Sequence, residues 1–148
     1  MALITDKLVV LDLEAPDRHA ATRILAEALD SEGRVTDLDG FLADVRKREE
    51  QMPTGLPGGI GIPHARSAHV TEPSLVFGRT AGVDFGAEDG PATLIFLIAA
   101  PEGGGEEHLA ILAKLARRLV RPDFRQSLHD APDSAAVVDI VTREVVNQ

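Results

Sequence analysis

The sequence predicts a single α/β domain, a sandwich in which helices cover both faces of a mixed, mostly parallel sheet of about five strands. Two observations carry this prediction. Helical patterns alternate along the chain with a few short apolar segments, and one of these, "TLIFLIAAP" at 93–101, is apolar on both faces. The 148 residues fit one domain of ordinary size, and no stretch has the composition of a linker. We therefore expect one unit over residues 1–148.

The first third of the chain predicts one strand followed by two helices. Residues 8–14 ("LVVLDLE") are dense in Val and Leu, which favours a strand. Asp17 is a candidate N-cap for a helix whose apolar residues recur at helical spacing until Gly33 closes it. A second helix is expected from about Asp37 to the charged string that ends at Glu50.

The rest of the chain predicts two strands and three helices. Residues 74–80 ("SLVFGRT") and 93–101 favour strands, and "GVDFGAEDGPA" between them is typical of turns. Residues 106–120 carry the clearest helical pattern, just after a flexible "EGGG". Two further helices are expected to begin at the Pro-Asp pairs of "RPDFRQSLHD" and "PDSAAVVDIVTREVV".

Composition and charge exclude several classes of function. The chain has no cysteine, which excludes disulfides, thiolate catalysis and Cys-based zinc sites. A formal charge of −9, from 24 acidic and 15 basic residues, argues against nucleic acid as the main partner. No apolar run approaches the roughly 20 residues of a membrane span, and the N-terminus lacks the features of a signal peptide. We expect a cytoplasmic protein with no direct membrane insertion.

Common catalytic and cofactor motifs are absent from the sequence. It contains no G-x-x-x-x-G-K-[ST], no G-x-G-x-x-G, no H-E-x-x-H and no G-x-S-x-G. The five histidines form no H-x-H pair and no helical i,i+4 pair, so a metal site has weak local support. We expect neither a cofactor nor a metal.

One segment, "REEQMPTGLPGGIGIPHAR" at 48–66, concentrates glycine and proline ahead of His64. Imidazole accepts a phosphoryl group when one nitrogen is unprotonated and the other is held as an N–H donor. Pro63 fixes the backbone before His64, and Gly58, Gly59 and Gly61 would let backbone N–H groups point at a phosphoryl group. On these residues alone, a surface loop with a histidine and no function stays the alternative.

The same segment resembles the active-site signature of the fructose–mannitol type of enzyme IIA from the phosphoenolpyruvate-dependent sugar phosphotransferase system. The resemblance rests on Arg48-Glu49, Thr54-Gly55 and Ile62-Pro63-His64. It continues through "GVDFGAEDGPATLIFLIAAP" and "HLAILAKLARRLVRPDFRQSL" and covers about residues 3–146, closest to fructose-specific IIA. Family members often have alanine after the Arg-Glu pair, whereas this chain has Glu50, whose side chain we expect to point away from the site.

The resemblance implies a phosphotransferase that works through a phosphohistidine. HPr, the phosphocarrier protein, would phosphorylate His64 at Nε2, and the chain would pass the group to a cysteine of a IIB domain. That IIB domain belongs to a permease with a membrane IIC domain, which phosphorylates sugar during uptake. An apolar rim for these partners is expected around His64, from Gly55, Leu56, Pro57 and Ile60.

Three further site residues follow from the resemblance, each with an alternative. His108 matches the second active-site histidine of the family. It falls at a helix N-terminus, which favours a bound anion and a neutral imidazole. From the residues alone, the simpler interpretation is a partly buried core histidine. Arg48 offers a fork to two phosphoryl oxygens or is a solvated cation at a helix end. Thr54 would bind the phosphoryl group with its hydroxyl or cap the next turn.

Two rival functions stay open. A regulatory, nitrogen-type IIA shares the histidine motif and controls a target protein through its phosphorylation state; "GVDFGAEDGPA" favours the fructose type instead. A binding module that has lost the chemistry is disfavoured by the presence of Arg48, His64 and His108. The other histidines, His19, His69 and His129, are expected at the surface.

Overall fold

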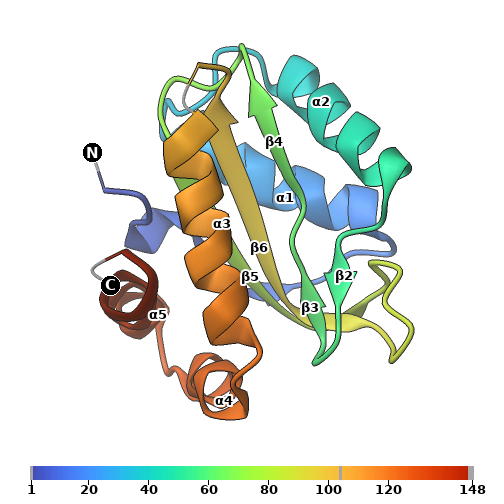
Figure 1. Cartoon of the computed structure of the whole chain (residues 1–148), viewed down its shortest axis with the longest axis vertical. Helices are drawn as coiled ribbons and strands as arrows, with labels where there is room; N and C mark the ends of the chain where they lie inside the picture. The colour runs from blue at the N-terminus through green and yellow to red at the C-terminus, as the bar shows by residue number, and fades with distance from the viewer. Residues whose placement is uncertain (1, 104, 147–148) are drawn as a thin grey trace.

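The computed structural model describes residues 2–103 and 105–146, with only the backbone for 105–109. A six-stranded sheet forms the centre of the molecule, with helices on both of its faces (Figure 1). The strand order is β1-β5-β6-β3-β2, and β4 also pairs with β6. The strands are β1 (Val9–Leu13), β2 (Gly55–Leu56), β3 (Ile60–Gly61), β4 (His64–Ser67), β5 (Ser74–Val83) and β6 (Ala92–Pro101).

Strand β6 is the centre of the sheet. It runs antiparallel to β5 and parallel to both β3 and β4, while β1 is parallel to β5 and β2 is antiparallel to β3. The sheet is therefore mixed and mostly parallel, as the sequence predicts. It has six strands where about five were expected, because the glycine- and proline-rich segment contributes three short strands.

In the described part of the chain, five α-helices surround the sheet: α1 (Arg18–Ser31), α2 (Leu38–Gln51), α3 (Gly105–Leu119), α4 (Pro122–Asp130) and α5 (Ser134–Val141). A short 3₁₀ turn (Asp6–Leu8) precedes β1, and one π-helical turn (Thr142–Val146) follows α5. Figure 1 shows α1 behind the sheet, α3 in front of it and α2 beside β4. The expected N-cap Asp17 is confirmed, since it accepts from Ala20 N at 2.8 Å. The second helix begins after Asp37, as expected, and Asp37 also caps it by accepting from Gly40 N at 3.1 Å.

The core is built from aliphatic residues and a few phenylalanines. Residues 94–100 of β6 are all buried, which confirms a strand covered on both faces. Phe77 of β5 and Phe96 of β6 meet edge to face with their ring centroids 5.3 Å apart. Strand β5 runs to Val83, three residues beyond the predicted end, because Val83 still pairs with Ala92.

Within the part of the chain that the structure describes, no helix combines the length and the apolar character that crossing a bilayer requires.

Candidate functional site

His64 is the first residue of β4 and lies beside Ile98 of β6. Its Nδ1 is 2.8 Å from the carbonyl oxygen of Ile62. Because a carbonyl oxygen only accepts hydrogen bonds, Nδ1 carries the hydrogen and the lone pair of the neutral ring is on Nε2. The carbonyl of the intervening Pro63 accepts from Ile98 N at 3.0 Å, which ties this turn to the central strand. The fold therefore sets both the place and the tautomer of the imidazole.

The surroundings of His64 favour its neutral form. Burial lowers the pKa of His64 below its ordinary value, and the positive charge of Arg48 lowers it further. The hydrogen bond to the Ile62 carbonyl and the negative charge of Glu49 act in the opposite direction, with less total effect than burial and Arg48 together. At neutral pH the ring is therefore uncharged, which is the state that a phosphoryl acceptor needs.

His64 lines an open pocket of about 440 Å³ between α2, β4 and α3. Its other described lining residues are Asp44, Lys47, Arg48, Gln51, Ala65, Arg66 and Leu112. Three of these side chains are cationic and one is anionic, so the pocket has the electrostatic character of an anion site. The structure thus brings Arg48 and His64 together, and it adds Lys47 and Arg66, whose direction the sequence does not give.

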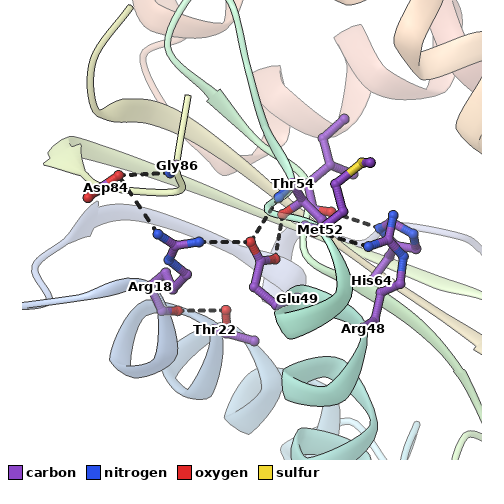
Figure 2. A network of polar contacts seen from close by, with 10 residues as sticks. Arg18, Thr22, Arg48, Glu49, Met52, Thr54, His64, Asp84 and Gly86 are labelled. Carbon is purple, nitrogen blue, oxygen red and sulfur yellow. Dashed lines mark hydrogen bonds and ion pairs between the residues drawn. The ribbon is translucent and has the colours of Figure 1, made fainter. Parts of the chain in front are cut away.

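Arg48 lies in the last turn of α2, next to the imidazole of His64 (Figure 2). Its Nη1 donates to the carbonyl oxygen of Met52 at 3.1 Å. This bond ties one edge of the guanidinium to the segment that follows α2. The side chain is half-buried and borders the pocket, so it is not only a solvated helix-end cation.

Glu49 is a buried carboxylate with three donors around it (Figure 2). Thr54 Oγ1 donates to Oε1 at 2.6 Å, while Thr54 N and Arg18 Nη1 donate to Oε2 at 2.8 and 3.1 Å. In this structure the hydroxyl of Thr54 therefore donates its hydrogen to Glu49. A role of Thr54 as a phosphate ligand stays a prediction.

Sequence reasoning missed Glu49 and Arg18 as parts of the site. A signal for Glu49 was present, because it follows Phe41 and Val45 at four-residue steps and so falls on the buried face of α2. A carboxylate on such a face needs hydrogen-bond partners or a counter-ion. No comparable pattern in the sequence points to Arg18.

Two of the glycines ahead of His64 form a backbone turn. Gly58 and Gly59 have φ of +96° and +77° and form the turn between β2 and β3. The N–H of Gly58 donates to Asp89 Oδ2 at 2.9 Å, so its expected direction toward a phosphoryl group is wrong. The expected rim is wrong for Ile60, which is 1% exposed because it belongs to β3 inside the sheet, whereas Leu56 is 36% exposed.

The remaining histidines have varied surroundings. His108 falls within α3, and its side chain lies outside the described residues. His19 is exposed, as expected. His69 and His129 are half-buried rather than at the surface, and His129 Nε2 lies 3.3 Å from Thr93 Oγ1. Glu50 is exposed and does not line the pocket, in agreement with its expected direction.

Comparison with known proteins decides the family. The family model described as "Phosphoenolpyruvate-dependent sugar phosphotransferase system, EIIA 2" matches residues 2–144. The chain belongs to this family. This EIIA chain is therefore a phosphotransferase component of that system, as the resemblance of the 48–66 segment implies.

Individual relatives of this EIIA chain include both fructose-specific components and a nitrogen regulatory protein. It is 39% identical over 142 residues to the fructose-specific EIIA component of Haloferax volcanii, covering 93% of this chain and 92% of the relative. It is 36% identical over 143 residues to the fructose-specific EIIABC component of Bacillus subtilis, which is 95% of this chain but 22% of that protein. The crystal structure of nitrogen regulatory protein IIA-Ntr from Neisseria meningitidis has 32% identity and a TM-score of 0.87, covering 95% of this chain and 97% of that one.

Proposed function

We propose that this EIIA is a phosphoryl carrier of the fructose type, which accepts a phosphoryl group from HPr on Nε2 of His64 and donates it to a cysteine of a IIB domain. The single observation that carries the proposal is the Nδ1–H···O=C bond of His64 to Ile62, which directs the lone pair to Nε2. The cationic pocket around it supports the same role. The chain acts as a single domain over residues 1–148, in the cytoplasm, and serves a permease with a membrane IIC domain.

Each transfer is an in-line displacement at phosphorus. In the first, the Nε2 lone pair of His64 attacks phosphorus, the N–P bond of the phosphohistidine on HPr breaks, and its electron pair returns to the HPr imidazole. In the second, the IIB cysteine thiolate attacks, the Nε2–P bond breaks, and the electron pair returns to Nε2. Nδ1 keeps its hydrogen throughout, bonded to Ile62. The chain itself supplies position and electrostatic stabilisation.

Arg48 and His108 have distinct proposed roles in these steps. The guanidinium of Arg48 binds equatorial oxygens of the phosphoryl group, since it borders the pocket beside His64. His108 stabilises the same group from α3; its support is the resemblance, together with its position one helical turn before Leu112, which lines the pocket. Thr54 keeps its place as a candidate phosphate ligand.

A labelling experiment tests the acceptor. Incubation with phosphoenolpyruvate, enzyme I and HPr is expected to add one acid-labile, alkali-stable phosphate to the wild type and none to His64→Ala. His129→Ala is the control, because His129 is half-buried near Thr93 and away from the pocket lining. Undiminished label in His64→Ala would show that another residue accepts the group.

A second candidate function is regulation of a target protein by a nitrogen-type IIA. The likeness to the IIA-Ntr structure at a TM-score of 0.87 favours it. Transfer from the phosphorylated chain to a purified fructose-type IIB domain separates the two functions. We expect phosphate to appear on the IIB cysteine; stable phosphorylation with no transfer to any IIB domain would favour the regulatory function.

A further inference from the structure

We infer that Glu49 is a positioning residue for phosphoryl transfer: from its buried place at the end of α2 it fixes the backbone from which both Arg48 and His64 are oriented. This inference deepens the proposed function and rests on it for its catalytic consequence. Its structural consequence, the orientation and tautomer of His64, is measurable without any phosphoryl donor.

The carboxylate of Glu49 joins two helices to the chain that leaves α2. Oε2 of Glu49 accepts a hydrogen bond from Nη1 of Arg18, in the first turn of α1, at 3.1 Å. The same oxygen also accepts a hydrogen bond from the N–H of Thr54 at 2.8 Å. Oε1 accepts one from the Thr54 hydroxyl at 2.6 Å. Arg18 also lies 3.9 Å from Asp84, from Nη2 to Oδ1. A buried carboxylate is stable only with such partners, so these bonds hold Thr54 in one place.

A continuous path of hydrogen bonds runs from Thr54 to the reacting imidazole. The carbonyl of Thr54 accepts from the N–H of Ile62 at 3.1 Å, and the carbonyl of Ile62 accepts from Nδ1 of His64 at 2.8 Å. Ile62 makes both bonds, through its N–H and through its carbonyl on the next peptide unit, so the residue that sets the tautomer of His64 is itself bonded to the residue that Glu49 holds. A shift of Thr54 would move the Ile62 carbonyl and release Nδ1.

A second path runs from the same segment to the guanidinium. Arg48 Nη1 donates to the carbonyl of Met52, two residues before Thr54. Figure 2 shows Glu49 on one side of the 52–54 segment and Arg48 with His64 on the other. Anchoring Thr54 therefore restricts the acceptor of Arg48 as well as that of His64.

Glu49 acts through these neighbours and not on the phosphoryl group. The described lining of the His64 pocket contains Arg48 but not Glu49. Glu49 instead lines a separate cavity of about 520 Å³ between α1 and α2, together with Arg18. Its neighbour Glu50 is exposed and offers a matched control, because it carries the same charge one residue further along the chain.

Three variants test the positioning role: Glu49→Ala, Glu49→Gln and the control Glu50→Ala. The imidazole ¹⁵N spectrum of His64 reports its tautomer in the unphosphorylated protein, and the rate of labelling from phospho-HPr reports transfer. We expect Glu49→Ala to show a mixture of both tautomers and to be labelled about tenfold to a hundredfold more slowly, since loss of alignment has effects of this size. Glu50→Ala is expected to match the wild type in both measurements.

Glu49→Gln separates position from charge. The glutamine oxygen can accept from Thr54 N and Arg18, and its amide can donate to the Thr54 hydroxyl once that hydroxyl rotates. We therefore expect Glu49→Gln to keep the Nδ1–H tautomer and to stay within about fivefold of the wild-type rate, a loss of about one hydrogen bond's net value. Equal effects of Gln and Ala would overturn the positioning role in favour of a purely electrostatic one.

Wild-type tautomer and rate in a folded Glu49→Ala would overturn the inference outright. If Glu49→Ala does not fold, Thr54→Val and Thr54→Ser decide, because Val loses the hydroxyl bond and Ser keeps it. Thr54→Val is expected to shift the tautomer and Thr54→Ser is not; equal spectra for the two would overturn the inference. If the wild type is not labelled by phospho-HPr at all, the proposed function fails, while the tautomer spectra still decide the role of Glu49.

Discussion

His64 is subject to four influences that differ in sign. Burial and Arg48 disfavour the imidazolium, whereas the Ile62 carbonyl and Glu49 favour it. Burial is the largest, so the pKa of His64 lies below the ordinary value. Since only the neutral ring can attack phosphorus, the site keeps its acceptor active at a pH where an exposed histidine would already be protonated.

This balance predicts the pH dependence of His64. Its folded pKa lies below its unfolded value of about 6.5, so between the two the unfolded chain binds more protons and stability falls as the pH drops through this window. An NMR titration should therefore give His64 a midpoint below the ordinary histidine value of about 6.5. Arg48→Gln should raise the pKa of His64, because a positive neighbour is lost, and Glu50→Gln should leave it unchanged. A midpoint for His64 at or above about 6.5 would contradict the effect of burial.

At the scale of residues, sequence and structure agree where the motif is local. Arg48 and His64 are given by a contiguous segment, and the structure places both at one pocket. The network behind them could not be predicted in full, because Arg18 lies 31 residues before Glu49 and meets it only through the packing of α1 against α2. Whether Thr54 and His108 bind the phosphoryl group stays a prediction.

The glycine- and proline-rich segment around His64 was expected to be a loop, but it forms three short strands. Strands β2 and β3 have two residues each, too few for an alternating pattern to be recognised. They form because β6 is long enough to pair with β3 near its start and with β4 near its end. The glycines make this possible, because β3 passes so close to Phe85 that a methyl group at Gly61 would lie 2.7 Å from the ring.

This close approach predicts the effect of Gly61→Ala. The new methyl group would overlap the buried ring of Phe85, so we expect the free energy of unfolding to fall by about 1–3 kcal/mol. Gly103→Ala is the control, because nothing lies within 4 Å of a methyl group there. Urea denaturation measures both, and equal midpoints for the two variants would show that β3 does not depend on this packing.

For the whole molecule, the alternation of helices with a doubly buried strand was sufficient to predict the architecture. Strand β6 was recognised because it is apolar at consecutive positions, and the helices because their caps and apolar spacing agree. The pairing of strands was not predictable in the same way. The parallel contact of β4 with β6 joins segments more than 30 residues apart and depends on the turn at Pro63.

The central place of β6 predicts a large cost for truncating its core. Phe96 is fully buried and meets Phe77 edge to face, so Phe96→Ala should lower the free energy of unfolding by about 3–5 kcal/mol. A domain of this size has about 5–15 kcal/mol in total, so the variant would be close to its limit. Val120→Ala, at a site that is 75% exposed, should change little. Equal stability of the two variants in urea would contradict the described core.

The most direct test is to identify the nitrogen that carries phosphate. Phosphorylating ¹⁵N-labelled protein with phosphoenolpyruvate, enzyme I and HPr, and then measuring ¹⁵N–³¹P coupling, locates the N–P bond. Because Nδ1 of His64 donates to Ile62, we expect one phosphoryl group per chain, bonded to Nε2 of His64. Phosphate on Nδ1 of His64, or on any other residue, would contradict the site described above.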